Sequence, residues 1–172
     1  MPLSSTAGQR AAPRHRQRWL ALAICLLLGT SLGAETAPDA DFGSLAGETE
    51  SLQDHRGKVV VLNLWATWCS PCLIEIPHLV ELQSELDPEE ATVIGLALDS
   101  GSADAIRRFW TRTLNIEPTY PLWLGTVEQA EALFDARAVP TTLIIDREGR
   151  IRERLLGLQT RQDLLAAIAP YL

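Results

Sequence analysis

The chain has 172 residues, 47% of them hydrophobic, which is enough for one packed domain and too few for two ordinary ones. Four of its 15 basic residues are arginines within residues 1–34, so residues 35–172 hold 11 basic against 22 acidic side chains. Phosphate contacts require clustered Lys or Arg, so this acidic balance argues against a nucleic-acid partner.

The first 34 residues have the pattern of an export signal. Three arginines, Arg14, Arg16 and Arg18, precede an apolar run that begins at Trp19, and small residues follow up to Ala34. The order basic, apolar, small is typical of a secretory signal. The uncharged stretch of residues 19–34 is shorter than the ~20 residues of a comfortable membrane span, although bilayers tolerate short spans by thinning. We therefore expect residues 1–34 to be a signal peptide or an N-terminal membrane anchor, which places the rest of the chain in the periplasm or another extracytoplasmic space.

Strand and helix patterns alternate along the rest of the chain. A polar linker is expected at residues 35–40, before the domain. The predicted elements, in order, are a hairpin at 41–52, a strand at 59–65, a helix at 70–86, a strand at 91–98, a helix at 104–114, a short strand at 120–124, a helix at 126–136, a hairpin at 141–156 and a closing helix at 160–171. Such alternation predicts an α/β fold, a three-layer α/β/α sandwich whose mixed sheet has a parallel core and an antiparallel edge.

Two of the predicted helices have an apolar stripe at helical spacing. In residues 70–86 the stripe comprises Ile74, Leu79, Leu82 and Leu86, and in residues 126–136 it comprises Val127, Ala130, Leu133 and Phe134. Pro71 falls in the opening turn of the first of these helices, where its missing N–H is tolerated. Both stripes support the prediction of a helix.

The cysteine pattern points to redox chemistry. Cys25 lies in the N-terminal apolar run, which leaves Cys69 and Cys72 as the only cysteines of the domain. A disulfide between residues so close together constrains the unfolded chain little, so it would contribute little to the stability of the fold. A metal site is the other alternative, but the pair offers two ligands, and His78 would make only three. In an exported protein, two cysteines at this spacing favour thiol–disulfide exchange.

The position of the pair gives each cysteine a role. Cys69 follows a buried strand directly and opens a helix, where unpaired N–H groups and the helix dipole favour an anion. A thiolate is the nucleophile of exchange, so we expect Cys69 to attack. Cys72 lies one turn further along and is expected to resolve the mixed disulfide that Cys69 forms.

With this cysteine pair between a buried strand and a helix, the chain resembles the thioredoxin superfamily, and within it the TlpA/ResA/CcmG group of extracytoplasmic thiol–disulfide oxidoreductases. The resemblance covers about residues 41–172. It depends on Gly57-Lys-Val-Val-Val-Leu-Asn-Leu-Trp-Ala-Thr-Trp-Cys-Ser-Pro-Cys72, on Glu75 and Pro77, and on Val139-Pro-Thr-Thr-Leu-Ile-Ile-Asp146. It implies a thioredoxin-like domain at 41–172 with an inserted helix–strand unit at about residues 102–124.

The resemblance also implies further site residues. It implies a cis bond before Pro140, placed against the cysteine pair, that exposes the Val139 backbone to a client protein. It implies a buried Glu75 that exchanges protons with the cysteines. Asn63 stands where cytoplasmic thioredoxins have an aspartate, so Glu75 would do this alone. The client surface is expected to comprise Trp68, Ser70, Pro71, Val139 and Thr141.

The expected partners are exported protein thiols or disulfides, with apocytochrome c and metal-site assembly proteins as candidates, and a membrane thiol reductant as electron donor. No cofactor and no metal is expected, and the protein is expected to be a monomer. At Arg137–Thr141 the chain departs from the glycine-rich CcmG pattern, which puts a dedicated cytochrome c role in doubt. Two alternatives stay open on the same fold: a copper-binding metallochaperone-type assembly factor and a peroxidase.

Overall fold

A computed structural model describes residues 35–99 and 102–172. The predicted signal peptide or anchor at residues 1–34 lies outside the described residues. Among the helices that the structure does describe, none combines the length and the apolar character needed to cross a bilayer.

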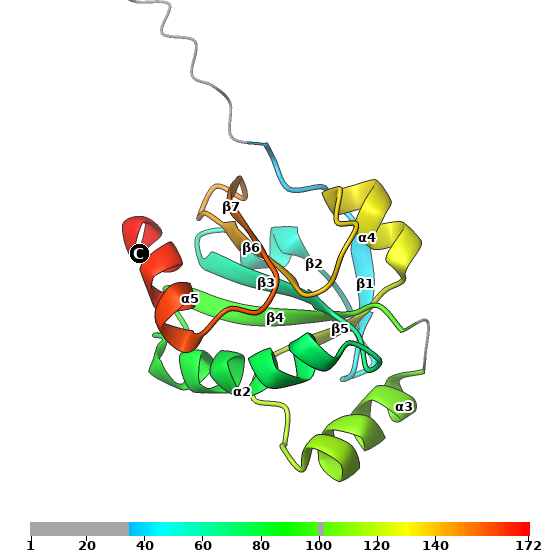
Figure 1. Ribbon diagram of the computed structural model, residues 1–172. Coiled ribbons are helices and arrows are strands. Elements are labelled where there is room, and N and C mark those ends of the chain that lie inside the picture. Colours follow the sequence, from blue (N-terminus) through cyan, green and yellow to red (C-terminus); the bar gives the residue numbers. More distant parts are fainter. Residues whose placement is uncertain (1–34, 100–101) are drawn as a thin grey trace, which may run out of the picture. The chain divides into compact units, whose positions relative to one another are not determined.

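The centre of the domain is one mixed sheet of seven strands (Figure 1). Its order is β2-β1-β5-β4-β3-β6-β7, and the three central strands β3, β4 and β5 are parallel. The strands are β1 (Asp41–Ser44), β2 (Thr49–Ser51), β3 (Val59–Trp65), β4 (Ala91–Ala97), β5 (Leu122–Leu124), β6 (Thr141–Ile145) and β7 (Ile151–Leu156). β6 and β7 form the predicted antiparallel edge, and the 41–52 hairpin forms a second antiparallel edge by pairing with β5.

Helices cover both faces of the sheet, which confirms the three-layer thioredoxin-like fold. α2 (Ser70–Glu85), α3 (Ala103–Arg108) and α5 (Arg161–Ile168) contribute apolar side chains to the core on one face. α4 (Val127–Phe134) does so on the other. Every residue of β3 is buried, as expected for a central strand covered on both faces.

The inserted unit has the predicted elements with one local difference. Ser102 caps α3, and the chain continues as a π-helix turn, η2 (Phe109–Leu114), before β5. Trp110 of this turn is fully buried and packs edge-on against Trp65 and Tyr120. The insertion therefore adds a helix and a strand to the domain and also supplies a large aromatic side chain to its core.

Two apolar residues of the helical stripes lie at the surface. Ile74 is 59% exposed because the buried side chains of α2 are spaced three and four residues apart at Cys72, Glu75, Ile76, Leu79 and Leu82, which puts Ile74 on the opposite face. Val127 is exposed at the first position of α4, where that helix has not yet reached the core. The helix predictions were right, and the structure shows that these two stripe residues do not face the core.

The predicted linker at residues 35–40 is packed against the domain. Thr36 bridges Arg150, the Ala37 N–H donates to the Gly149 carbonyl at 2.9 Å, and the Ile151 N–H donates to the Glu35 carbonyl at 2.7 Å. Composition indicated a polar tether, but these residues extend the antiparallel edge beside the β6–β7 turn. Since β6 runs from Pro140 toward this turn, the contact lies at the end of the sheet away from Cys69.

Candidate active site

Cys69 and Cys72 form a disulfide at the start of α2. Their sulfurs are 2.07 Å apart and their Cα atoms 5.3 Å apart. Cys69 is the N-cap of the helix, and its Sγ accepts the Cys72 N–H at 3.2 Å. Sγ of Cys69 thus occupies the position in which a helix N-terminus stabilises negative charge.

The first turn of α2 favours this arrangement. Pro71 lies within the first two helical positions, where a proline N–H is not needed, and the turn holds no acidic residue. Both cysteines are nearly covered, at 5% exposed for Cys69 and 1% for Cys72. Cys69 is the more accessible of the two, in agreement with the predicted order of attack.

Glu75 lies one turn beyond Cys72 and is completely buried. Its carboxylate is held by neutral donors. Asn63 Nδ2 donates to Oε2 at 2.8 Å, and the Gln159 N–H donates to Oε1 at 3.0 Å. Asn63 Nδ2 also donates to Thr142 Oγ1 at 2.9 Å, because Asn63 and Thr142 face each other across β3 and β6.

These surroundings raise the pKa of Glu75. Burial raises it from an ordinary 4.5 to about 7, although the hydrogen bonds from Gln159, Asn63 and Thr142 act in the opposite direction. No cation is among these contacts, so desolvation prevails. A carboxyl with a pKa near 7 can both take up and release a proton at neutral pH.

The loop before β6 completes the site. The Val139–Pro140 peptide bond is cis, and the Pro140 carbonyl accepts the Gly157 N–H at 2.9 Å. Val139 is half-buried and packs against the core cluster that contains both cysteines. The loop and the start of α2 therefore lie together, although 71 positions separate Pro140 from Cys69.

Four of the five residues expected at the client surface are accessible. Trp68 is 63% exposed, Ser70 and Pro71 are exposed, and Val139 is half-buried. Thr141 is the exception, because its side chain is fully buried and its hydroxyl donates to the Ala138 carbonyl at 2.7 Å. The prediction that Thr141 contacts the client was wrong, and its hydroxyl instead braces the loop before Pro140.

A small apolar cavity lies beside Trp68, the residue that precedes Cys69 in the chain. It has a volume of about 230 Å³, and Trp68, Leu98, Val127 and Val139 are among its lining residues, with Arg137 as the charged one. Val127, which belongs to the apolar stripe of α4, therefore lines the same cavity as Trp68.

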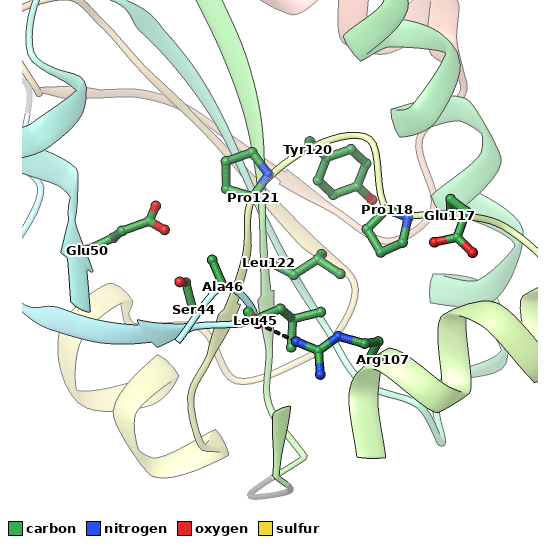
Figure 2. A pocket seen from close by; sticks show the side chains of 10 residues that line it. All are labelled: Ser44, Leu45, Ala46, Glu50, Arg107, Glu117, Pro118, Tyr120, Pro121 and Leu122. Carbon is green, nitrogen blue, oxygen red and sulfur yellow. Dashed lines mark hydrogen bonds between the residues drawn. The ribbon is translucent and has the colours of Figure 1, made fainter. Parts of the chain in front are cut away.

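A larger cavity, of about 370 Å³, lies between the β1–β2 hairpin, α3 and the segment before β5 (Figure 2). Tyr120, Glu117 and Arg107 line it, and the Arg107 guanidinium donates to the Leu45 carbonyl (Figure 2). None of the predicted site residues is in its lining. Across residues 35–99 and 102–172, no three His, Cys, Asp or Glu side chains are grouped as a metal site requires.

The sequence indicated the cysteines and, through the family resemblance, Glu75, but it missed part of the site. Thr142 and Gln159 were not anticipated as partners of Glu75. Thr142 could have been found from the pairing of β3 with β6, which sets it opposite Asn63. Gln159 acts through its backbone N–H, so its side-chain type gave no signal.

Comparison with known proteins agrees with this geometry. The AhpC/TSA family model matches residues 34–154. The thioredoxin-like protein YneN of Bacillus subtilis is 33% identical over 76% of this chain and 75% of its own length. The thiol-disulfide oxidoreductase ResA of Geobacillus thermodenitrificans is 30% identical over 75% of this chain and 72% of its own length.

Solved structures show the same likeness. A DsbF homologue from Corynebacterium diphtheriae superposes with a TM-score of 0.69 at 30% identity, covering 82% of this chain and 88% of that one. A structure described as a thiol:disulfide interchange protein DsbE from Chlorobium tepidum gives 0.67 at 26% identity, covering 78% of this chain and 96% of that one. With its cysteine pair in disulfide contact on a thioredoxin-like fold, the chain belongs to the AhpC/TSA family and is a thiol–disulfide oxidoreductase.

Proposed function

We propose that the protein is an extracytoplasmic disulfide reductase that acts on exported proteins, with Cys69 as nucleophile and Cys72 as resolving thiol. The observation that carries the proposal is the position of Cys69 Sγ, which caps α2 and accepts the Cys72 N–H. That N–H and the dipole of the helix stabilise a Cys69 thiolate.

The exchange then proceeds in two balanced steps. In the first, the Cys69 thiolate attacks one sulfur of a client disulfide, forms a mixed disulfide and releases the other client sulfur as a thiolate. In the second, Cys72 loses its proton and attacks Cys69 Sγ, which frees the remaining client thiolate and closes the Cys69–Cys72 bond. The client gains two electrons, and a membrane thiol reductant returns two electrons to the protein.

Glu75 is proposed as the base for the second step. It lies on the same helix as Cys72, three positions further, and is buried beneath the site. With a pKa of about 7, its carboxylate is a stronger base than an exposed glutamate, and it can accept the Cys72 proton when that thiol must attack.

The client is proposed to bind across the start of α2 and the loop that contains Pro140. Trp68, Ser70 and Pro71 are exposed next to Cys69 in the chain, and Val139 is half-buried in the loop before Pro140. An extended client segment can pair with backbone groups at such an edge. Exported protein thiols, including those of apocytochrome c or metal-site assembly proteins, fit this proposal.

The proposed location follows from residues 1–34, where arginines, an apolar run and small residues have the order of an export signal. The protein would then be released into the periplasm after cleavage, or held at the inner membrane by residues 19–34. Fractionation of cells that express the full chain, with N-terminal sequencing of the product, distinguishes the two forms.

A Cys72→Ser variant tests the proposed clients. Without the resolving thiol, Cys69 should stay joined to its client by the mixed disulfide. The trapped partners should be exported proteins, and reduction of this disulfide should release them. Recovery of no disulfide-linked partner beyond that of a Cys69→Ser control would contradict the proposal. The reduction potential tests the direction, since such pairs span from about −270 to about −120 mV, and a value near the oxidising end assigns an oxidase or isomerase instead.

The two alternatives have direct assays. A copper-binding assembly factor would bind Cu(I) stoichiometrically through the cysteines and a required histidine. A peroxidase would consume hydrogen peroxide with turnover in the presence of a thiol reductant. We expect neither activity, because a Trp-Cys-Ser-Pro-Cys segment provides neither a third ligand at clear spacing nor a lone peroxidatic cysteine.

A further inference from the structure

A carboxylate at the end of β4 holds the loop that leads to Cys69. The Thr67 N–H donates to both oxygens of Asp99, at 3.1 Å to Oδ1 and 2.9 Å to Oδ2. The Thr67 hydroxyl donates to Oδ1 at 2.5 Å. Asp99 thus binds both hydrogen-bond donors of Thr67 through charge-assisted bonds, which are the stronger kind.

The topology of the sheet brings these two residues together. β3 and β4 are parallel neighbours, so their carboxyl ends lie side by side. The Leu98 N–H donates to the Trp65 carbonyl at 2.9 Å, which continues the pairing past the end of β3. Asp99 also forms an isolated bridge with Thr126, the N-cap of α4. Asp99 therefore lies between the redox loop and the start of another helix.

The segment that Asp99 holds is short. Only Thr67 and Trp68 separate Ala66 from Cys69, and the Cys69 N–H donates back to the Ala66 carbonyl at 3.1 Å. Ala66 is fully buried, so one end of this turn is fixed by the core. The Asp99 carboxylate fixes its middle, and the direction in which Cys69 enters α2 depends on both.

We propose that Asp99 and Thr67 are positioning residues of the redox site, which keep the Sγ of reduced Cys69 at the first turn of α2. In the disulfide form, the bond to Cys72 also holds this sulfur in place. In the reduced form that bond is absent, and the anchored loop keeps Cys69 Sγ within reach of the Cys72 N–H. Asp99 touches neither sulfur in this role and acts through Thr67.

A purely electrostatic role for Asp99 predicts the opposite change in the acidity of the Cys69 thiol. The titratable and charged groups around Cys69 are Cys72 and Glu75 on α2, Asp99 after β4, and Arg137, which lines the same cavity as Trp68. If Asp99 acted only as a nearby negative charge, it would disfavour the Cys69 thiolate, and its removal would make the thiol more acidic. Loss of the proposed positioning instead makes the Cys69 thiol less acidic, because its sulfur is no longer held near the Cys72 N–H.

Two nearly isosteric variants separate these roles. Thr67→Val removes the hydroxyl donor and leaves the charge of Asp99, whereas Asp99→Asn removes the charge and half of the acceptor capacity. The measurement is the rate of iodoacetamide alkylation of Cys69 in the fully reduced full-length chain, followed from pH 4 to pH 9. We expect both variants to react about tenfold more slowly at pH 6, with the pH midpoint raised, because a smaller fraction of the thiol is ionised.

Matched variants serve as controls. Asp104→Asn removes an exposed carboxylate that contacts Arg107, and it should leave the alkylation profile unchanged. Thr67→Ser retains the hydroxyl and should react like the parent chain. In the Thr67→Val/Asp99→Asn double variant, the slowing should be less than the product of the two single effects, since both act through one contact.

Only slower alkylation in both single variants supports the proposal. Faster alkylation in Asp99→Asn assigns a purely electrostatic role and overturns it. An unchanged profile in either variant overturns it as well, because α2 alone would then fix the sulfur. Circular dichroism of each reduced variant checks that it is folded, and Thr67→Ala, which also lacks the hydroxyl, replaces Thr67→Val if that variant is not.

Discussion

Asn63 Nδ2 donates a hydrogen bond of 2.8 Å to Glu75 Oε2 in the interior of the protein, joining the middle of β3 to α2. An amide cannot take up a proton, and the other two partners of this carboxylate, Thr142 and the Gln159 N–H, are also neutral. Glu75 is therefore the only member of this network that titrates near neutral pH.

A Glu75→Gln substitution should slow the second step of exchange and leave the fold intact. Glutamine has the same length, and its amide oxygen can still accept from either Asn63 or the Gln159 N–H. It cannot take the Cys72 proton. We expect the mixed disulfide to persist about a hundredfold longer, as general-base catalysis contributes on this order. Rapid acid quenching with a disulfide peptide measures this lifetime. Glu81→Gln, which changes an exposed residue of the same helix, is the control, and equal lifetimes in both variants would exclude Glu75 from the mechanism.

The raised pKa of Glu75 also predicts how stability depends on pH. The folded protein holds the proton up to about pH 7, whereas the unfolded chain releases it near 4.5. Protonated Glu75 thus favours the folded state, and this contribution is complete below pH 4.5 and is lost as the pH rises to 7. At about 1.4 kcal/mol for each pKa unit, the whole window is worth roughly 3 kcal/mol.

Urea unfolding of the oxidised protein at pH 4.5 and pH 7.5 measures this effect. The free energy of unfolding should fall more steeply with pH in the parent chain than in Glu75→Gln, since other titrating groups are common to both. Parallel pH curves for the two proteins would show that Glu75 is already ionised in the folded state at pH 4.5.

The sequence predicted the redox centre well because its chemistry depends on local order. A buried apolar run, two cysteines and a proline in the opening turn put Cys69 at a helix N-terminus without knowledge of distant contacts. The exposure of Ile74 and Val127 could not be predicted, because an apolar residue at helical spacing does not reveal which face of the helix the core covers. Asn63, Thr142 and Gln159 meet at Glu75 only through the pairing of β3 with β6 and the return of the chain before α5, which sequence spacing does not reveal.

Replacement of Asn63 by aspartate should create a coupled pair of carboxyls. The new side chain would place a second carboxyl against Glu75, where the amide now donates at 2.8 Å. Two buried like charges cannot both ionise readily, so the pair should share a proton at neutral pH. We expect Asn63→Asp to be about 3 kcal/mol less stable at pH 9 than the parent chain, with a much smaller difference at pH 5. A pH-independent loss of stability would indicate a packing defect instead.

Trp65 and Trp68 should respond differently to truncation. Trp68 is 63% exposed beside Cys69, whereas Trp65 is fully buried at the end of β3 and packs against Trp110. Trp68→Ala should change stability by less than about 1 kcal/mol but lower kcat/KM for reduction of a protein disulfide. Trp65→Ala should cost about 3–5 kcal/mol. Denaturant unfolding and an insulin reduction assay measure the two effects, and unaltered kinetics in Trp68→Ala would remove it from the client surface.

The most direct measurement is the reactivity of Cys69 in the reduced protein. Iodoacetamide alkylation at pH 7, with the modified residue located by mass spectrometry, should proceed faster at Cys69 than at either cysteine of an unfolded peptide containing residues 65–75. Cys72 should react more slowly than Cys69, because it is the less exposed of the two and does not cap the helix. If Cys69 reacts no faster than the peptide, the N-terminus of α2 does not stabilise a thiolate, and the proposed mechanism is wrong.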